Sequence, residues 1–162
     1  MNAVTELADR IALRPVADAD RPFLLALYAS TRQDELDLVA WGEGQREAFV
    51  RMQFDLQDAE YRRLSPGGRF DVVEVAGQPV GRLYVDLLPG ELRIVDISLL
   101  PAFRGQGIGR ALLIALQCEA AASGSSVSLH VEMHNRAAGL YERLGFATTA
   151  EHGVHRLMQW RS

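Results

Sequence analysis

One stretch decides the fold: Leu99-Leu100-Pro101-Ala102-Phe103-Arg104-Gly105-Gln106-Gly107-Ile108-Gly109-Arg110. It has the pattern of an apolar strand end, a turn with three glycines at alternate positions, and the start of an apolar helix. The first N–H groups of a helix have no intrahelical partner and lie at its positive end. Glycines there let an anion approach these donors closely. Because Arg104 and Arg110 add positive charge, the stretch predicts a diphosphate cradle; the alternative is a tight turn that binds nothing.

The sequence on both sides of this stretch predicts a mixed α/β domain. Alternating apolar residues predict strands at 10–16, 70–75, 80–86 and 92–99, the last three forming a meander. Two helices fall between the first two strands, one capped by Asp20 and one with Phe49, Met52 and Leu56 on an apolar face. After the turn we expect a largely buried helix over 108–122, a strand over 127–133, a helix over 136–144, and strands over 146–151 and 154–160. The order β-α-α-β-β-β-α-β-α-β-β makes a single α/β domain over residues 1–162, with residues 1–9 frayed.

A second motif follows the fifth predicted strand. It begins at Asn135, places Ala138 and Tyr141 three and six residues later, and ends at Gly145-Phe146. Together with Arg104-Gly105-Gln106-Gly107-Ile108-Gly109, which matches R/Q-x-x-G-x-G/A, it resembles the GCN5-related N-acetyltransferase (GNAT) superfamily. The resemblance covers about residues 70–160, whereas the dinucleotide fingerprint G-x-G-x-x-G fails because its last glycine would fall on Arg110.

The resemblance implies a fold and a co-substrate. It implies a central mixed sheet splayed between the fourth and fifth strands, with acetyl-CoA in the splay and its pyrophosphate on the glycine turn. The cofactor-binding residues that it implies are Leu99, Leu100, Arg104, Gly105, Gln106, Gly107, Ile108, Gly109, Arg110, Asn135 and Tyr141.

The resemblance also implies direct acetyl transfer to an amine. Tyr141 would protonate the leaving sulfur, because an ordinary tyrosine keeps its proton at neutral pH. The base is open: His130 and Asp96 are the first candidates, and Glu91 and Glu74 are further ones. At the position of His130, protein N-terminal acetyltransferases of this superfamily carry a glutamate. This difference weakens the inference that this chain shares their base and their protein substrate. Alternation of His130, Glu132 and His134 also invites a metal site, but nothing else in the sequence supports one, so we expect no metal.

Composition excludes several other functions. The chain has 162 residues, 48% of them hydrophobic, and a net charge of −4, which argues against a nucleic-acid partner. All 17 basic residues are arginines, so Walker-type phosphate loops and Schiff-base chemistry lack their lysine. The lone Cys118 excludes an intrachain disulfide, and we expect it to be an inert thiol in the buried helix. Without a membrane-spanning run or a secretory signal, the expectation is a soluble, cytoplasmic protein.

Three functions remain open. The first is an N-acetyltransferase for a primary amine, with a small molecule favoured over a protein. The second is a non-catalytic acyl-CoA sensor, and the third an enzyme that acetylates a polypeptide N-terminus or lysine. The resemblance makes a homodimer possible. Candidates for the acceptor cleft are the N-terminal side chains Tyr28, Trp41, Phe49, Gln53, Phe54, Gln57 and Tyr61, with the acidic cluster Asp34, Glu35, Asp37, Glu43 and Glu47 to attract a cationic amine.

Overall fold

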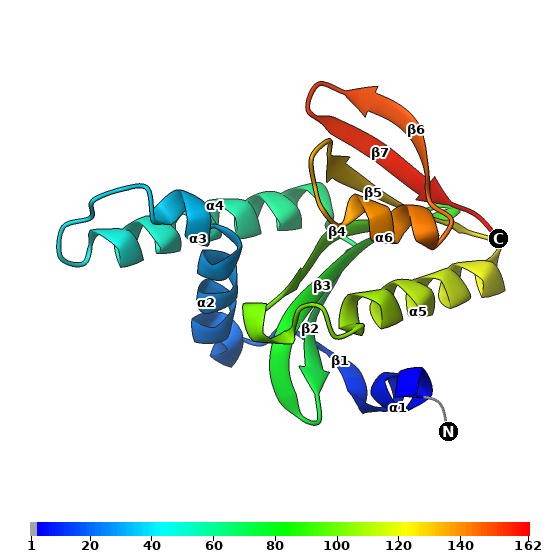
Figure 1. Ribbon diagram of the computed structural model, residues 1–162, viewed down its shortest axis with the longest axis horizontal. Helices are drawn as coiled ribbons and strands as arrows, with labels where there is room; N and C mark the ends of the chain where they lie inside the picture. Colours follow the sequence, from blue (N-terminus) through cyan, green and yellow to red (C-terminus); the bar gives the residue numbers. More distant parts are fainter. Residues whose placement is uncertain (1–2) are drawn as a thin grey trace.

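The protein is built on one seven-stranded mixed sheet, shown by a computed structural model that describes residues 3–162 (Figure 1). The strand order is β1-β2-β3-β4-β5-β7-β6, with neighbours antiparallel except for the parallel pair β4–β5. The strands are β1 (Ile11–Pro15), β2 (Arg69–Val75), β3 (Gln78–Leu88), β4 (Glu91–Leu99), β5 (Ser126–Glu132), β6 (Ala147–His152) and β7 (His155–Trp160).

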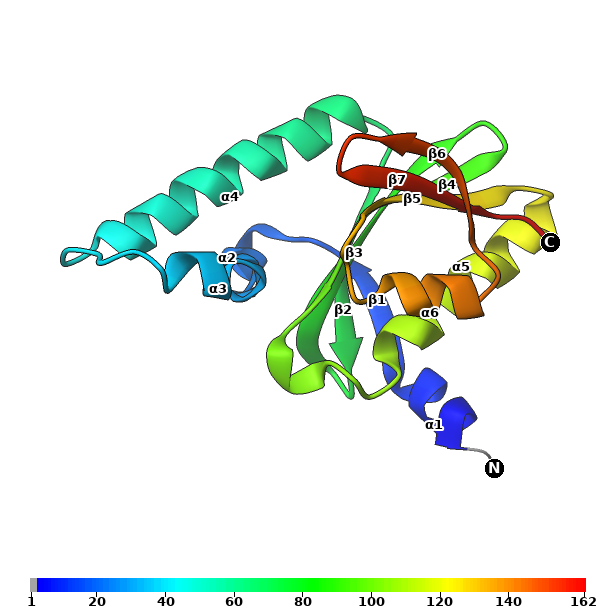
Figure 2. The ribbon, with the colours of Figure 1, turned by 45° about the horizontal axis from the view of Figure 1, so that its top comes forward.

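Helices cover both faces of the sheet. In Figures 1 and 2, α2, α3 and α4 gather on one side of the strands, while α1, α5 and α6 lie on the other. None of the helices described here is long and apolar enough to cross a membrane. Their bounds are α1 (Ala3–Arg10), α2 (Arg21–Thr31), α3 (Gln33–Leu36), α4 (Gln45–Leu64), α5 (Ile108–Ser123) and α6 (Ala138–Arg143).

Strand periodicity divides the interior into two clusters. Successive side chains of a strand point to opposite faces, so Leu83 and Val85 of β3 join α5 in the main core. Arg82 and Tyr84 point the other way, toward α4. A second, smaller core packs α2, α3 and α4 together, with Leu24, Tyr28, Leu36, Val50 and Phe54 at its centre.

The sheet splits where β4 leaves β5. Their parallel pairing runs only from Glu91↔Ser126 to Ile94↔Leu129. Immediately beyond, the register against β3 shifts, because Tyr84 pairs with Asp96 while Val85 pairs with Ile94. Val95 is therefore an extra residue on β4, and such a bulge bends a strand. The splay implied by the resemblance is present, and it opens between β4 and β5.

The predicted element order is confirmed, with two added helices. The segment expected to be frayed, residues 1–9, forms helix α1 from Ala3 onward, and its Leu7 packs against the main core. Residues 1–2 lie outside the described part of the chain. The short helix α3 was also not expected. Asp20 does stand at the start of α2, but its carboxylate pairs with Arg14 and accepts the N–H of Ala17 instead of capping the helix.

Two expectations about helix faces are wrong. On α4, Met52 and Leu56 are 51% and 61% exposed, and the buried positions are Val50 and Phe54. The long helix α5 is buried along one side only, so Cys118 is an exposed thiol rather than a core residue. Helical spacing gave the right element in both cases, but it did not identify which side meets the sheet.

Candidate active site

The glycine turn leaves the first turn of α5 open at its N-terminus. Gly105 and Gly107 have φ of +72° and +88°, a left-handed conformation that favours glycine. Gly107 is the N-cap, and among residues 3–162 no side-chain hydrogen bond caps the helix. Apart from the adjoining backbone, no atom of the described residues lies within 4 Å of where a Cβ would stand at Gly105 or Gly109. Free helix N–H groups and open space beside them suit a bound diphosphate, so the residues present fit the phosphates of acetyl-CoA.

The two arginines of this stretch lie in different places. Arg104 turns back along the splay, where its Nε donates to the carbonyl of Leu99 over 2.9 Å. Arg110 lies in a separate hollow between α1 and α5, together with Gln106 and Gly107. The sequence predicts that both charges lie beside one diphosphate. In the structure the Arg104 side chain lies in the splay, and Arg110 lies on the side of α5 that faces α1.

From the glycine turn, a cavity of about 240 Å³ follows the splay. Leu99 and Arg104 line it from the segment between β4 and α5, and Tyr141 lines it from α6. Most of its wall is apolar, which suits the alkyl chain of a thioester. The remaining lining residues are Thr31, Ile97, Ser98, Gly109, Leu113, Ala137 and Leu140.

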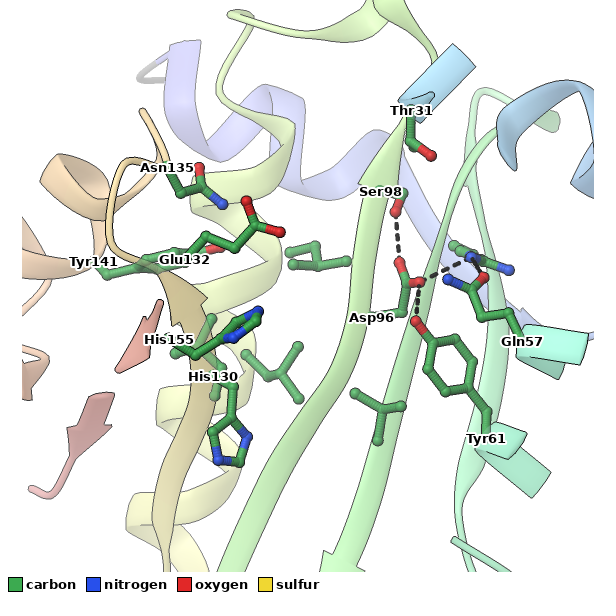
Figure 3. A pocket seen from close by; sticks show the side chains of 15 residues that line it. Thr31, Gln57, Tyr61, Asp96, Ser98, His130, Glu132, Asn135, Tyr141 and His155 are labelled. Carbon is green, nitrogen blue, oxygen red and sulfur yellow. Dashed lines mark hydrogen bonds and ion pairs between the residues drawn. The ribbon is translucent and has the colours of Figure 1, made fainter. Parts of the chain in front are cut away.

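A second cavity of about 390 Å³ adjoins the first (Figure 3). Thr31, Ile97, Ser98 and Tyr141 line both cavities and mark where they meet. The walls of the second cavity come mainly from α4, β3, β4 and β5, with contributions from α2, α6 and β7, and most are polar. They comprise Gln57, Tyr61, Arg82, Ile94, Val95, Asp96, Leu129, His130, Glu132, Asn135 and His155.

Tyr141 stands at the junction on a rigid support. Its ring packs edge-on against Phe146, with the centroids 5.9 Å apart, and the residue is 6% exposed. Burial raises the pKa of the Tyr141 phenol, and the negative charge of Asp96 adds to the effect. The phenol therefore keeps its proton at neutral pH and is present there in the form that an acid catalyst needs.

Asn135 has a structural task at the turn into α6. Its side-chain oxygen accepts the backbone N–H of Ala137 over 2.8 Å, which fixes the turn. The residue also lines the larger cavity. Gly145 follows α6 with φ of +93°, in the C′ position that the sequence predicts.

Asp96 is held from three sides. Its Oδ2 accepts hydrogen bonds from Tyr61 Oη at 2.9 Å and from Arg82 Nη2 at 2.8 Å, and its Oδ1 accepts one from Ser98. Arg82 Nη2 also donates to Gln57 Oε1. Figure 3 shows this network along the β4 wall of the cavity. Asp96 is therefore the counter-charge of the buried Arg82.

The β5 wall carries His130 and Glu132, both exposed to the cavity. Burial lowers the pKa of His130, and the positive Arg93 lowers it further. His134 lies beyond the strand and does not line the cavity. Within residues 3–162 no group of three metal-ligating side chains comes together.

Other predicted site residues lie elsewhere. Glu91 pairs with Arg93, and Glu74 pairs with Arg14 near β1, so neither is a base in the cleft. Of the N-terminal candidates, Gln57 and Tyr61 line the larger cavity. The core between the helices takes Tyr28, Trp41, Phe49 and Phe54 instead, and none of the acidic cluster Asp34, Glu35, Asp37, Glu43 and Glu47 lines this cavity.

Sequence reasoning missed Arg82, and it noted Glu132 only as part of a metal pattern. Arg82 is 1% exposed, and arginines are almost never buried this completely unless they are paired. In the sequence it is the one arginine within the otherwise apolar run of the second meander strand. Such a residue predicts a buried ion pair, but the sequence does not show which carboxylate is its partner.

Residues 66–148 match the family model of the acetyltransferase (GNAT) domain, which spans just over half of the chain. The chain belongs to the GNAT superfamily. In this GNAT chain the match begins at the turn before β2 and ends within β6, so it includes the glycine turn and Tyr141. No curated protein matches the chain in sequence.

Solved structures share the whole GNAT fold at low identity. The PaiA N-acetyltransferase from Thermoplasma acidophilum, in complex with coenzyme A, superposes with a TM-score of 0.70 at 16% identity, covering 94% of this chain and 99% of its own. An acetyltransferase from Thermus thermophilus gives 0.67 at 23% identity, with coverages of 94% and 97%. The ribosomal-protein-S18-alanine N-acetyltransferase from Escherichia coli gives 0.61 at 20%, with 93% of each chain covered. These likenesses establish the fold.

Proposed function

We propose that the protein is an acetyl-CoA-dependent N-acetyltransferase that transfers the acetyl group directly to a primary amine. The observation that carries this proposal is the meeting of two cavities at Tyr141. One cavity leads to the open N-terminus of α5, and the other is polar and lies on the far side of Tyr141 from that helix end. A donor and an acceptor can therefore occupy the protein together and react at the junction.

The residues divide the work along this path. The free N–H groups after Gly107 hold the pyrophosphate, and Arg104 adds positive charge along the splay. The amine nitrogen attacks the thioester carbonyl carbon, and the C–S bond of the tetrahedral intermediate then breaks. Tyr141 gives its proton to the departing thiolate. A pure acyl-CoA sensor has no need of a proton donor at this point, which favours catalysis.

A small acceptor is favoured over a protein. The acceptor cavity has about 390 Å³, which is in the size range of small-molecule sites, and side chains from several helices and strands wall it. The alternative keeps support from the fold, because the similar Escherichia coli structure is named for acetylating a ribosomal protein.

Thiol release from acetyl-CoA tests the proposal. The purified protein should release CoA thiol with at least one member of a panel of polyamines, amino sugars, amino acids and peptides. Thermal stabilisation by CoA without release from any amine would favour the sensor. Absence of both release and stabilisation would overturn the assignment of the cavity to acetyl-CoA.

A further inference from the structure

The acceptor cavity has an unequal set of charges. The charged side chains that line it are those of Arg82, Asp96 and Glu132, and two histidines, His130 and His155, line it as well. Arg82 and Asp96 cancel each other in a 2.8 Å ion pair. Across the described chain, 3–162, no arginine or histidine forms an ion pair with Glu132. Glu132 is thus the uncompensated charge of the cavity.

Arg82 offers no free charge to an acceptor. Its Nη2 is committed to Asp96 and Gln57. In the part of the chain described, its Nε and Nη1 have no hydrogen-bond partner, but both atoms are buried. The guanidinium carbon lies 5.0, 5.8 and 5.9 Å from the ring centroids of Tyr84, Tyr61 and Phe54. Aromatic faces thus surround the remaining N–H groups, and a carboxylate on the acceptor cannot reach them.

The strand register places Glu132 beside the reaction centre. The last β4–β5 pair is Ile94↔Leu129. Counting onward, Glu132 is level with Ile97, or with Ser98 once the extra residue Val95 is allowed for. Both Ile97 and Ser98 line the two cavities where they meet. In Figure 3 the Glu132 carboxylate extends from the β5 wall into the space between that strand and Asp96.

His130 is less suited to take a proton there. It lies two residues back along β5, about 6.6 Å farther from the junction. Burial and the positive Arg93 lower its pKa, which makes it a weaker base than an ordinary histidine. Asp96 is unsuitable for the different reason that its protonation would strand the buried Arg82.

We infer that Glu132 binds the acceptor's ammonium group and takes its proton, so that the site selects amines with no carboxylate beside the amine. This inference rests on the proposed function. The ammonium N–H bond breaks and the proton moves to Glu132, directly or through one water molecule. The freed lone pair forms the N–C bond, the C–S bond breaks, and the sulfur receives the Tyr141 proton. The nitrogen's second proton restores the phenol, and Glu132 passes its own to water, so one proton is released per turnover.

The charge inventory gives the acceptor class. A single free carboxylate attracts a cation, while an α-carboxylate on the acceptor would lie near Glu132 and Asp96 without a free cation to bind it. Repulsion between the acceptor's carboxylate and these two side chains should weaken its binding several-fold or more. Decarboxylated amines therefore fit the site, and the parent amino acids do not.

The first experimental arm is the pH profile of Glu132→Gln. At pH 7 kcat/KM should fall by about 100-fold, the scale of one lost acid–base group. From pH 7 to 9.5 the rate of this variant should rise about tenfold per pH unit, following the free amine, while wild type stays nearly flat. Glu151→Gln, on the exposed strand β6, is the matched control and should behave as wild type. CoA should stabilise all three proteins equally against heat.

The second arm compares acceptor pairs that differ by one carboxylate: agmatine and arginine, cadaverine and lysine, tyramine and tyrosine. Wild type should favour the decarboxylated member by at least about tenfold in kcat/KM, and Glu132→Gln should reduce that preference. Equal use of both members would overturn the acceptor class. A wild-type pH profile in Glu132→Gln, with the loss in His130→Gln instead, would overturn the role of Glu132 alone. A wild type that releases no thiol with any amine would overturn the proposed function and this inference with it.

Discussion

The guanidinium of Arg82 on β3 and the carboxylate of Asp96 on β4 both line the acceptor cavity and are largely withdrawn from water. Side-chain exposure is 1% for Arg82 and 11% for Asp96. Such a pair contributes little net stability, because removing two charges from water offsets their attraction. Its effect here is geometric: Arg82, Tyr61 and Ser98 together fix the orientation of Asp96, and the cavity keeps its shape without a bound acceptor.

Removing one partner of this ion pair should lower the free energy of unfolding more than removing both partners. Asp96→Asn leaves Arg82 as a buried charge without a counter-charge and should lower the free energy of unfolding by about 3 kcal/mol. Adding Arg82→Met to that variant should restore part of the loss. Urea denaturation of wild type, both single variants and the double variant measures this coupling. Additive losses would mean that the two charges do not interact.

Tyr141 carries a prediction of its own at the same scale. Tyr141→Phe should lower kcat by about 100-fold or more and leave the CoA dissociation constant within about twofold. Because burial raises the pKa of the phenol, the wild-type acid stays protonated to higher pH than an ordinary tyrosine, so any alkaline fall in kcat should lie above the ordinary tyrosine range. Tyr28→Phe, in the core between the helices, is the control and should turn over normally. Normal turnover by Tyr141→Phe would disprove the acid role.

At the scale of elements, the two ends of α5 offer a matched comparison. Gly107 begins the helix and Gly124 ends it, and both have positive φ. A glutamate at either place strains the backbone by a similar amount, on the order of 1–3 kcal/mol. Only Gly107→Glu also puts a negative side chain among the N–H groups that the phosphates need. Calorimetry should show at least about 100-fold weaker CoA binding for Gly107→Glu and little change for Gly124→Glu; equal losses would place the phosphates elsewhere.

Elements that carry a local signal were predictable from the sequence. The meander β2–β4, the glycine turn and the end of α6 at Gly145 all follow from residues that are close in the chain. The site is less predictable, because its parts meet through distant pairings. The partnership of Arg82 with Asp96 depends on the β3–β4 register and on the bulge at Val95, and neither has a sequence marker. The same bulge decides whether Glu132 is level with Ile97 or with Ser98.

At the scale of the whole molecule, the acceptor cavity lies between two cores. Gln57 and Tyr61 reach it from α4, which packs in the smaller core with α2 and α3. The glycine turn and α5 pack instead on the main core. Donor and acceptor sites therefore depend on different packing, although they meet at Tyr141.

This division predicts that truncating a buried leucine will have different functional effects in the two cores. Leu24 in the smaller core and Leu116 on the buried side of α5 are 4% and 3% exposed, so changing either to alanine should cost about 2–5 kcal/mol. Assayed well below its unfolding temperature, Leu24→Ala should raise the acceptor KM several-fold and leave CoA binding unchanged. Leu116→Ala should weaken CoA binding instead. Steady-state kinetics with calorimetric CoA titration separates the two, and parallel losses in both variants would show that one cooperative core supports both sites.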